Sequence, residues 1–81
     1  MNVTVLFFAQ ARELAGCARC QLPLDPGATV QDVRRAVGGR FPDLSALLPH
    51  CLFSVDQRYA GDEDTIEADC EIGCIPPVSG G

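Results

Sequence analysis

Lysine is absent from this chain of 81 residues, and its six basic residues are all arginines. No side-chain amine is therefore available to form a Schiff base or an isopeptide bond. Eleven acidic residues give a formal net charge of −5, whereas a surface that binds phosphates needs clustered Lys and Arg. The charge argues against nucleic acid and against anionic membranes as partners. It favours a basic patch on another protein.

Long hydrophobic runs are also absent, because no apolar stretch approaches the ~20 residues that a membrane-spanning helix requires. The longest apolar run near the N-terminus, residues 5–9, has the length of a strand. It lacks the basic leader and the small-residue cleavage site of a secretory signal. We therefore expect a cytoplasmic protein, and its length predicts one domain over residues 1–81.

Conventional catalytic sets are missing as well. The chain has one histidine, His50, which is followed by Cys51. Adjacent residues in a strand point to opposite faces, so these two do not predict a Cys–His pair. Gly38 and Gly39 lie at the end of a predicted helix with no lysine after them, so they do not predict a phosphate-binding loop.

The five cysteines are read as reduced thiols, mostly small buried hydrophobes. Cys17 and Cys20 have the spacing of a redox motif, and with Cys70 and Cys74 they could suggest a zinc site. However, positions four apart in a strand are ~13 Å from each other, too far to share one ion. We expect no metal. A thiol enzyme built on Cys17 and Cys20 stays open as an alternative.

The hydrophobic pattern predicts five strands and three helices. Thr29 and Asp32 form a capping-box-like pair at the start of the main helix, which Gly38-Gly39 is expected to end. Pro23 marks an edge strand, since proline cannot donate to a ladder. The predicted strands are residues 3–8, 18–24, 52–55, 58–60 and 71–75, and the predicted helices are residues 11–15, 30–37 and 42–48, the last stopped by Pro49. Their order predicts an α+β fold, the β-grasp arrangement of ubiquitin, with a mixed sheet packed on one main helix.

Six acidic residues lie between positions 62 and 71. Their preferred interpretation is a solvated loop, and the alternative is a docking surface for a basic partner.

The last seven residues, 75–81, read as an extended tail. Pro76 and Pro77 lack an N–H, so sheet pairing stops and the chain is held extended for roughly 20 Å. Gly80 and Gly81 have no side chains and could thread a channel that any Cβ would block. A carboxylate at Gly81 becomes attackable when it is coupled to a nucleotide as an acyl-adenylate. The tail therefore suits a carrier that one enzyme loads and another unloads.

Two segments, "VTVLFFAQARELAG" at 3–16 and "IPPVSGG" at 75–81, resemble the small subunit of molybdopterin synthase, a ubiquitin-like sulfur carrier. The resemblance implies that an ATP-dependent activating enzyme adenylates Gly81 and converts it to a thiocarboxylate. The tail then enters the large synthase subunit and gives its sulfur to a cyclic pyranopterin precursor. The carrier would hold no bound cofactor and would not be a catalyst alone.

By position, the resemblance implies that Gly81 bears the sulfur, that Gly80 threads the channel, and that docking involves Phe7, Ile75, Pro76, Pro77 and Val78. The chain departs from the family at Cys74, where a bulky aromatic residue is common, and at the neighbouring Gly73. Alternative functions are a sulfur carrier for thiamine or tRNA thiolation, and a ubiquitin-like modifier that is joined to lysines of other proteins.

Overall fold

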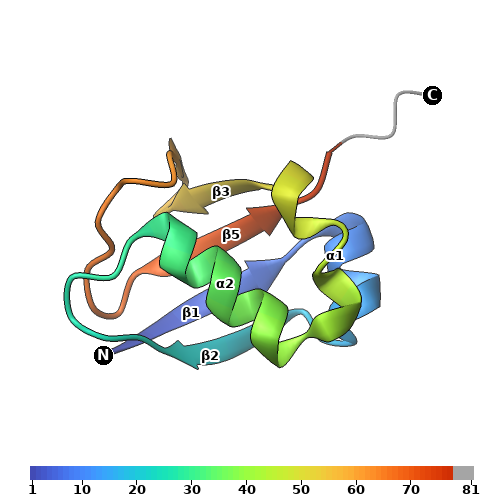
Figure 1. The fold of residues 1–81 in the computed structure, drawn as a ribbon, viewed down its shortest axis with the longest axis horizontal. Helices are drawn as coiled ribbons and strands as arrows, with labels where there is room; N and C mark the ends of the chain where they lie inside the picture. Colours follow the sequence, from blue (N-terminus) through green and yellow to red (C-terminus); the bar gives the residue numbers. More distant parts are fainter. Residues whose placement is uncertain (78–81) are drawn as a thin grey trace.

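The computed structural model describes residues 1–77, which form a sheet with one long helix across it (Figure 1). The elements are β1 (Asn2–Phe7), α1 (Ala9–Ala15), β2 (Arg19–Pro23), α2 (Val30–Arg40), two 3-10 turns η1 (Pro42–Leu44) and η2 (Leu48–His50), β3 (Leu52–Val55), β4 (Arg58–Ala60) and β5 (Glu71–Ile75). Within this part of the chain, no helix is both long and apolar enough to span a bilayer.

The five strands lie in the order β2-β1-β5-β3-β4. The central strands β1 and β5 are parallel, with Val5 opposite Ile72 and Phe7 opposite Cys74, and the other neighbours are antiparallel. A mixed sheet with its first and last strands at the centre confirms the predicted β-grasp fold. It also confirms β2, which ends at Pro23, as an edge strand.

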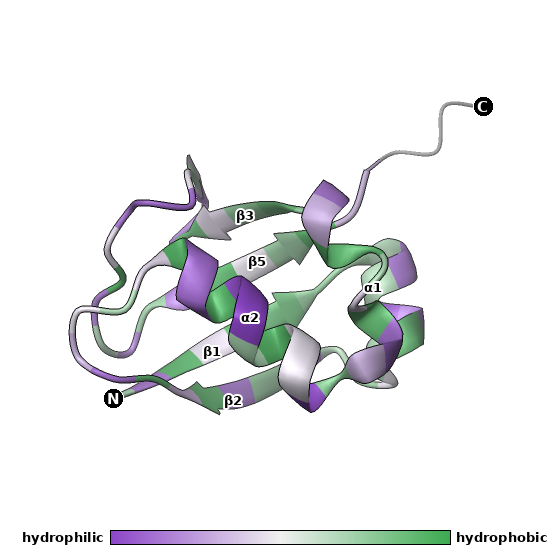
Figure 2. Cartoon of the chain, viewed as in Figure 1, coloured by the Kyte–Doolittle hydropathy of each residue, from purple (hydrophilic) through white to green (hydrophobic). Residues whose placement is uncertain are grey.

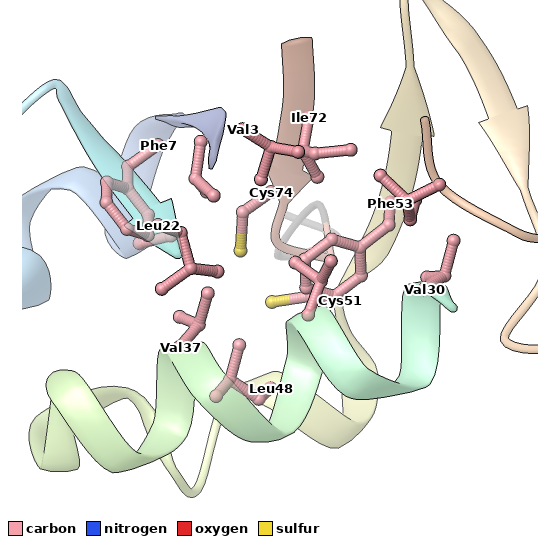
Figure 3. Close-up of a cluster of buried hydrophobic side chains, with 14 of the residues drawn as sticks. Val3, Phe7, Leu22, Val30, Val37, Leu48, Cys51, Phe53, Ile72 and Cys74 are labelled. Atoms are coloured by element: carbon pink, nitrogen blue, oxygen red, sulfur yellow. The ribbon is translucent and has the colours of Figure 1, made fainter. Parts of the chain in front are cut away.

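The core fills the space between α2 and one face of the sheet. Val30, Val33 and Val37 project from α2 and are fully buried, as the helical spacing predicts. They meet Val3, Val5 and Phe7 of β1 in one cluster (Figure 3). Hydrophilic residues occupy the outward side of α2 (Figure 2). The helix α2 is therefore amphipathic, with its apolar side packed on one face of the sheet and its polar side turned outward.

A capping box starts α2, as the sequence predicts. Thr29 N–H donates to Asp32 Oδ2 at 2.9 Å, and Asp32 N–H donates to Thr29 Oγ1 at 3.4 Å. The bond from the Thr29 backbone lowers the pKa of Asp32 below its usual value. A carboxyl whose folded pKa is lowered stabilises the fold above its unfolded pKa. That contribution is lost as the pH falls through the folded pKa.

The prediction that Gly38-Gly39 ends the main helix is wrong. The helix continues to Arg40, and its last bond runs from Phe41 N–H to the carbonyl of Val37 at 2.8 Å. A Cβ at Gly38 would lie 3.2 Å from Cδ1 of Leu48, tighter than an ordinary contact. Gly38 therefore serves the close approach of α2 to η2, and not termination.

The prediction of a third helix over residues 42–48 is also wrong. The segment forms two separate 3-10 turns, and Pro49 lies inside the second one instead of stopping it. Proline is tolerated there because the first positions of a helix have no internal partner for an N–H. The turns place Leu44 and Leu48 in the core.

We predict that Thr29→Ala lowers the free energy of unfolding by about 1 kcal/mol, because Asp32 N–H loses its partner. For a domain of this size that corresponds to a melting temperature about 4–8 °C lower. Urea and thermal unfolding at pH 7 measure the change. Ser45→Ala serves as the control, since its exposed hydroxyl donates to the Pro42 carbonyl outside any box. Equal effects of the two substitutions would contradict the role assigned to the box.

Candidate functional site

The central strand β5 leads to the C-terminal segment. Ile75 is half-buried and pairs with Leu52, Pro76 is buried, and Pro77 is exposed. The structure thus brings three of the predicted site residues together where β5 ends (Figure 1). The other predicted tail residues, Val78, Gly80 and Gly81, lie outside the described residues.

The sheet face opposite α2, which we call the open face, carries apolar side chains that remain exposed. One row crosses the strands through Leu6, Gly73, Ser54 and Tyr59. Beside it, Ile75 pairs with Leu52. Tyr59 is 74% exposed and Leu52 is 59% exposed. Large apolar side chains gathered next to the exit of β5 are typical of a protein–protein contact.

The predicted docking role of Phe7 needs correction. The Phe7 side chain is 3% exposed and packs edge-on against Phe41, with ring centroids 5.1 Å apart. Phe8 is 45% exposed, and its ring reaches the open face beside Gly73. Strand alternation gives the reason, because successive side chains point to opposite faces.

Phe8, Leu52, Tyr59 and Gly73 are the open-face residues that sequence reasoning missed. A signal for Phe8 was present. Alternate residues of a strand point to the same face. Asn2 and Thr4, which are polar, are therefore on the same face as Phe8. Val3 and Val5 are on the same face as Phe7. The polar positions mark the outward face, and Phe8 follows them.

Three cysteines lie in the core. Cys51 and Cys74 lie close together between the sheet and α2 (Figure 3), and the Cys51 thiol donates to the carbonyl of Leu47 at 3.5 Å. Burial raises the pKa of Cys74 to about 12, and the adjacent Cys51 adds to the shift. Burial also raises the pKa values of Cys51 and Cys70. Since the thiolate is the nucleophile and a raised pKa lowers its population, these thiols are expected to react slowly.

Cys17 and Cys20 are half-buried and pack at the edge of the same cluster. Desolvation raises the pKa of Cys20 despite the nearby Arg40. The structure does not bring this pair together with Cys70 and Cys74. Within residues 1–77, no group of three or more His, Cys, Asp or Glu side chains could hold a metal ion.

The acidic segment lies at the end of the sheet opposite the exit of β5 (Figure 1). Its backbone is fastened to the start of α2, since Gln31 N–H donates to the Asp62 carbonyl and Val30 N–H to that of Asp64. Arg34 pairs with Asp62 at 2.8 Å and also donates to the carbonyls of Leu48 and Cys51. The other carboxylates of the acidic segment are exposed, as both a solvated loop and a docking surface require.

The family model described as ThiS family matches residues 5–81. The chain belongs to the ThiS family. Two relatives with the name molybdopterin synthase sulfur carrier subunit support the resemblance inferred from the sequence. The one from Chlamydomonas reinhardtii is 32% identical, over 100% of both chains. The one from Caenorhabditis briggsae is 35% identical, over 100% of this chain and 99% of its own.

A solved structure agrees with this ThiS-family fold over the whole chain. SAMP1 (small archaeal modifier protein 1) from Haloferax volcanii superposes with a TM-score of 0.90 at 28% identity, covering 100% of both chains. The β-grasp fold and the resemblance to molybdopterin synthase small subunits are therefore confirmed.

We predict that native protein exposes two classes of thiol to a soluble disulfide reagent at pH 8. Cys17 and Cys20 react first, and the three core thiols react only as the protein unfolds. A pKa of about 12 leaves roughly one Cys74 in 10⁴ as thiolate at this pH. Spectrophotometric thiol counting with and without urea measures both classes. The double variant Cys17→Ser/Cys20→Ser is the control and loses the fast class. Five equally fast thiols in native protein would contradict the burial.

Proposed function

We propose that this chain is the sulfur carrier subunit of a molybdopterin synthase and acts in molybdenum cofactor biosynthesis. The observation that carries the proposal is full-length similarity to relatives of that name, at 32% and 35% identity. The exit of β5 supports it, because Pro76 and Pro77 direct the chain out of the sheet toward the glycines.

The chemistry takes place at the carboxylate of Gly81. An ATP-dependent activating enzyme joins this carboxylate to AMP and releases pyrophosphate. Hydrosulfide (HS⁻) delivered by a sulfur donor then attacks the acyl carbon, AMP leaves, and the product is a thiocarboxylate. In the large synthase subunit this sulfur is transferred to a cyclic pyranopterin precursor. Gly80 provides a backbone without a side chain where the tail passes through a narrow channel.

The open face is the surface that we assign to the large subunit. It shares the central strand β5 with the tail, so docking on Tyr59, Leu52 and Phe8 fixes where the tail begins. Ile75, Pro76, Pro77 and Val78 continue the contact into the partner. Positioning matters because a reacting group displaced by 1 Å can lose about 10²-fold in rate.

A ubiquitin-like modifier is the second candidate, and the similarity to a protein called a modifier favours it. In that case the carboxylate of Gly81 would be joined to an acceptor lysine on another protein. The two functions share the adenylate and differ in the nucleophile. Intact mass after incubation with the activating enzyme, ATP and a sulfur source separates them. Replacement of one oxygen by sulfur selects the carrier, and a branched Gly–Lys peptide in other proteins selects the modifier.

We predict that Leu52→Ala and Tyr59→Ala each weaken binding to the large subunit by about tenfold, because each side chain is an exposed apolar anchor of the open face. The control is Glu63→Gln/Glu67→Gln in the acidic segment at the far end, which should change the dissociation constant less than twofold. Titration calorimetry measures all variants. If the acidic variant loses more affinity than the two alanine variants, the docking surface has been assigned to the wrong end.

We predict that deletion of Gly81 abolishes adenylation and sulfur transfer. The deletion moves the terminal carboxylate by about 3.3 Å, beyond the tolerance of a reactive geometry. Thermal unfolding should not change, because the buried cluster is built from residues 3–74. Gly80→Ala should be milder and should mainly slow entry into the partners. Molybdopterin formation by the deletion variant would refute the assignment of Gly81.

A further inference from the structure

We propose that Gly73 is a positioning residue. Because it has no side chain, the ring of Phe8 packs over its backbone, a contact that we call the seat. The seat holds the ring in one place, so that it is presented as a fixed anchor to the large subunit. The inference rests on the proposed function for its partner. The seat itself rests on the geometry of the open face alone.

Gly73 lies at the centre of the open face, between Leu6 of β1 and Ser54 of β3. Gly73 is buried even though its position faces outward from the sheet, away from α2. A Cβ at this position would lie 3.3 Å from Cε2 of Phe8 and would collide with Oγ of Ser54. Two side chains therefore close over the space that a side chain at position 73 would fill.

The backbone of Phe8 is held from both sides. Its N–H donates to the carbonyl of Cys74 at 3.3 Å, which extends the β1–β5 pairing by one residue. Its carbonyl accepts from Ala11 N–H at 3.0 Å in the first turn of α1. Phe8 is also the residue that precedes α1, in an extended conformation. With the backbone fixed, the seat at Gly73 determines where the ring lies.

Glycine at this position has a local cost, because it weakens a strand interior relative to residues with side chains. Its φ is not in the left-handed region, so backbone conformation does not require it. The close approach of Ser54 Oγ and of the Phe8 ring is the remaining reason. A ring with one preferred placement loses less entropy on docking than a ring that is free, which favours affinity.

The seat can be tested by a double-mutant cycle in a Ser54→Ala background. This background removes the collision with Oγ, so that the nearest contacts of a Cβ at position 73 are the Phe8 ring at 3.3 Å and the Ser54 Cβ position at 3.7 Å. The four proteins are Ser54→Ala alone, with Gly73→Val, with Phe8→Ala, and with both. Gly61→Val is the matched control, since a Cβ at Gly61 meets only Asp64 Oδ2, at 3.9 Å.

Titration with the large subunit should show that Gly73→Val and Phe8→Ala each weaken binding by about tenfold. In the Phe8→Ala background, Gly73→Val should cost less than twofold, because the ring through which it acts is gone. Gly61→Val should bind like the background. Full additivity of the two losses, or unchanged binding by Gly73→Val, would overturn the positioning role. Thermal unfolding of each variant identifies any loss that is due to misfolding.

An independent readout needs no partner. The ring current of Phe8 should displace the Hα resonances of Gly73 in the proton spectrum, and Phe8→Ala should abolish that displacement. Failure of the wild-type chain to bind the large subunit would overturn the partner, and with it the proposed function. The displacement would then still establish the seat, and its absence would refute it.

Discussion

β1 and β5 run parallel at the centre of the sheet, and their register places Val5 beside Ile72 and Phe7 beside Cys74. This pairing joins the two ends of the chain. It turns one set of side chains toward α2 to form the core, and it turns the alternate set toward the open face. The strand that completes the core is therefore the same strand that carries Gly73, Ile75 and the exit of the tail. A slip of one residue would exchange the two faces.

Local chemistry made much of the fold predictable from the sequence. The capping box at Thr29 and Asp32 depends on residues three apart, and the edge position of β2 follows from Pro23. The errors arose where distant packing overrides local preference. Gly38 stays inside α2 because Leu48 approaches it, a contact that joins residues ten positions apart. No local rule indicates such a contact.

In the candidate site, too, the features that depend on local sequence could be predicted, and those that depend on the assembled sheet could not. The proline pair after β5 could be read directly, because proline stops a ladder wherever it occurs. The choice between Phe7 and Phe8 required knowing which set of alternate residues in β1 faces the core. The consecutive apolar residues at the end of β1 made this difficult to read. The seat at Gly73 could not be read at all, since it is made by Ser54 of β3 and by Phe8, which follows β1. Such a contact exists only once the sheet is assembled.

The open face and the exit of β5 belong to the same sheet, so under the proposed function a partner that takes the tail also covers the face. Two partners that both need the tail must then bind in turn, and neither can hand the carrier directly to the other. Throughput is limited by how long each complex lasts. At a typical association rate constant of about 10⁶ M⁻¹ s⁻¹, a dissociation constant of about 1 nM gives a residence time on the order of 10³ s. A carrier of this design is best served by affinities well short of the tightest that its surface could provide.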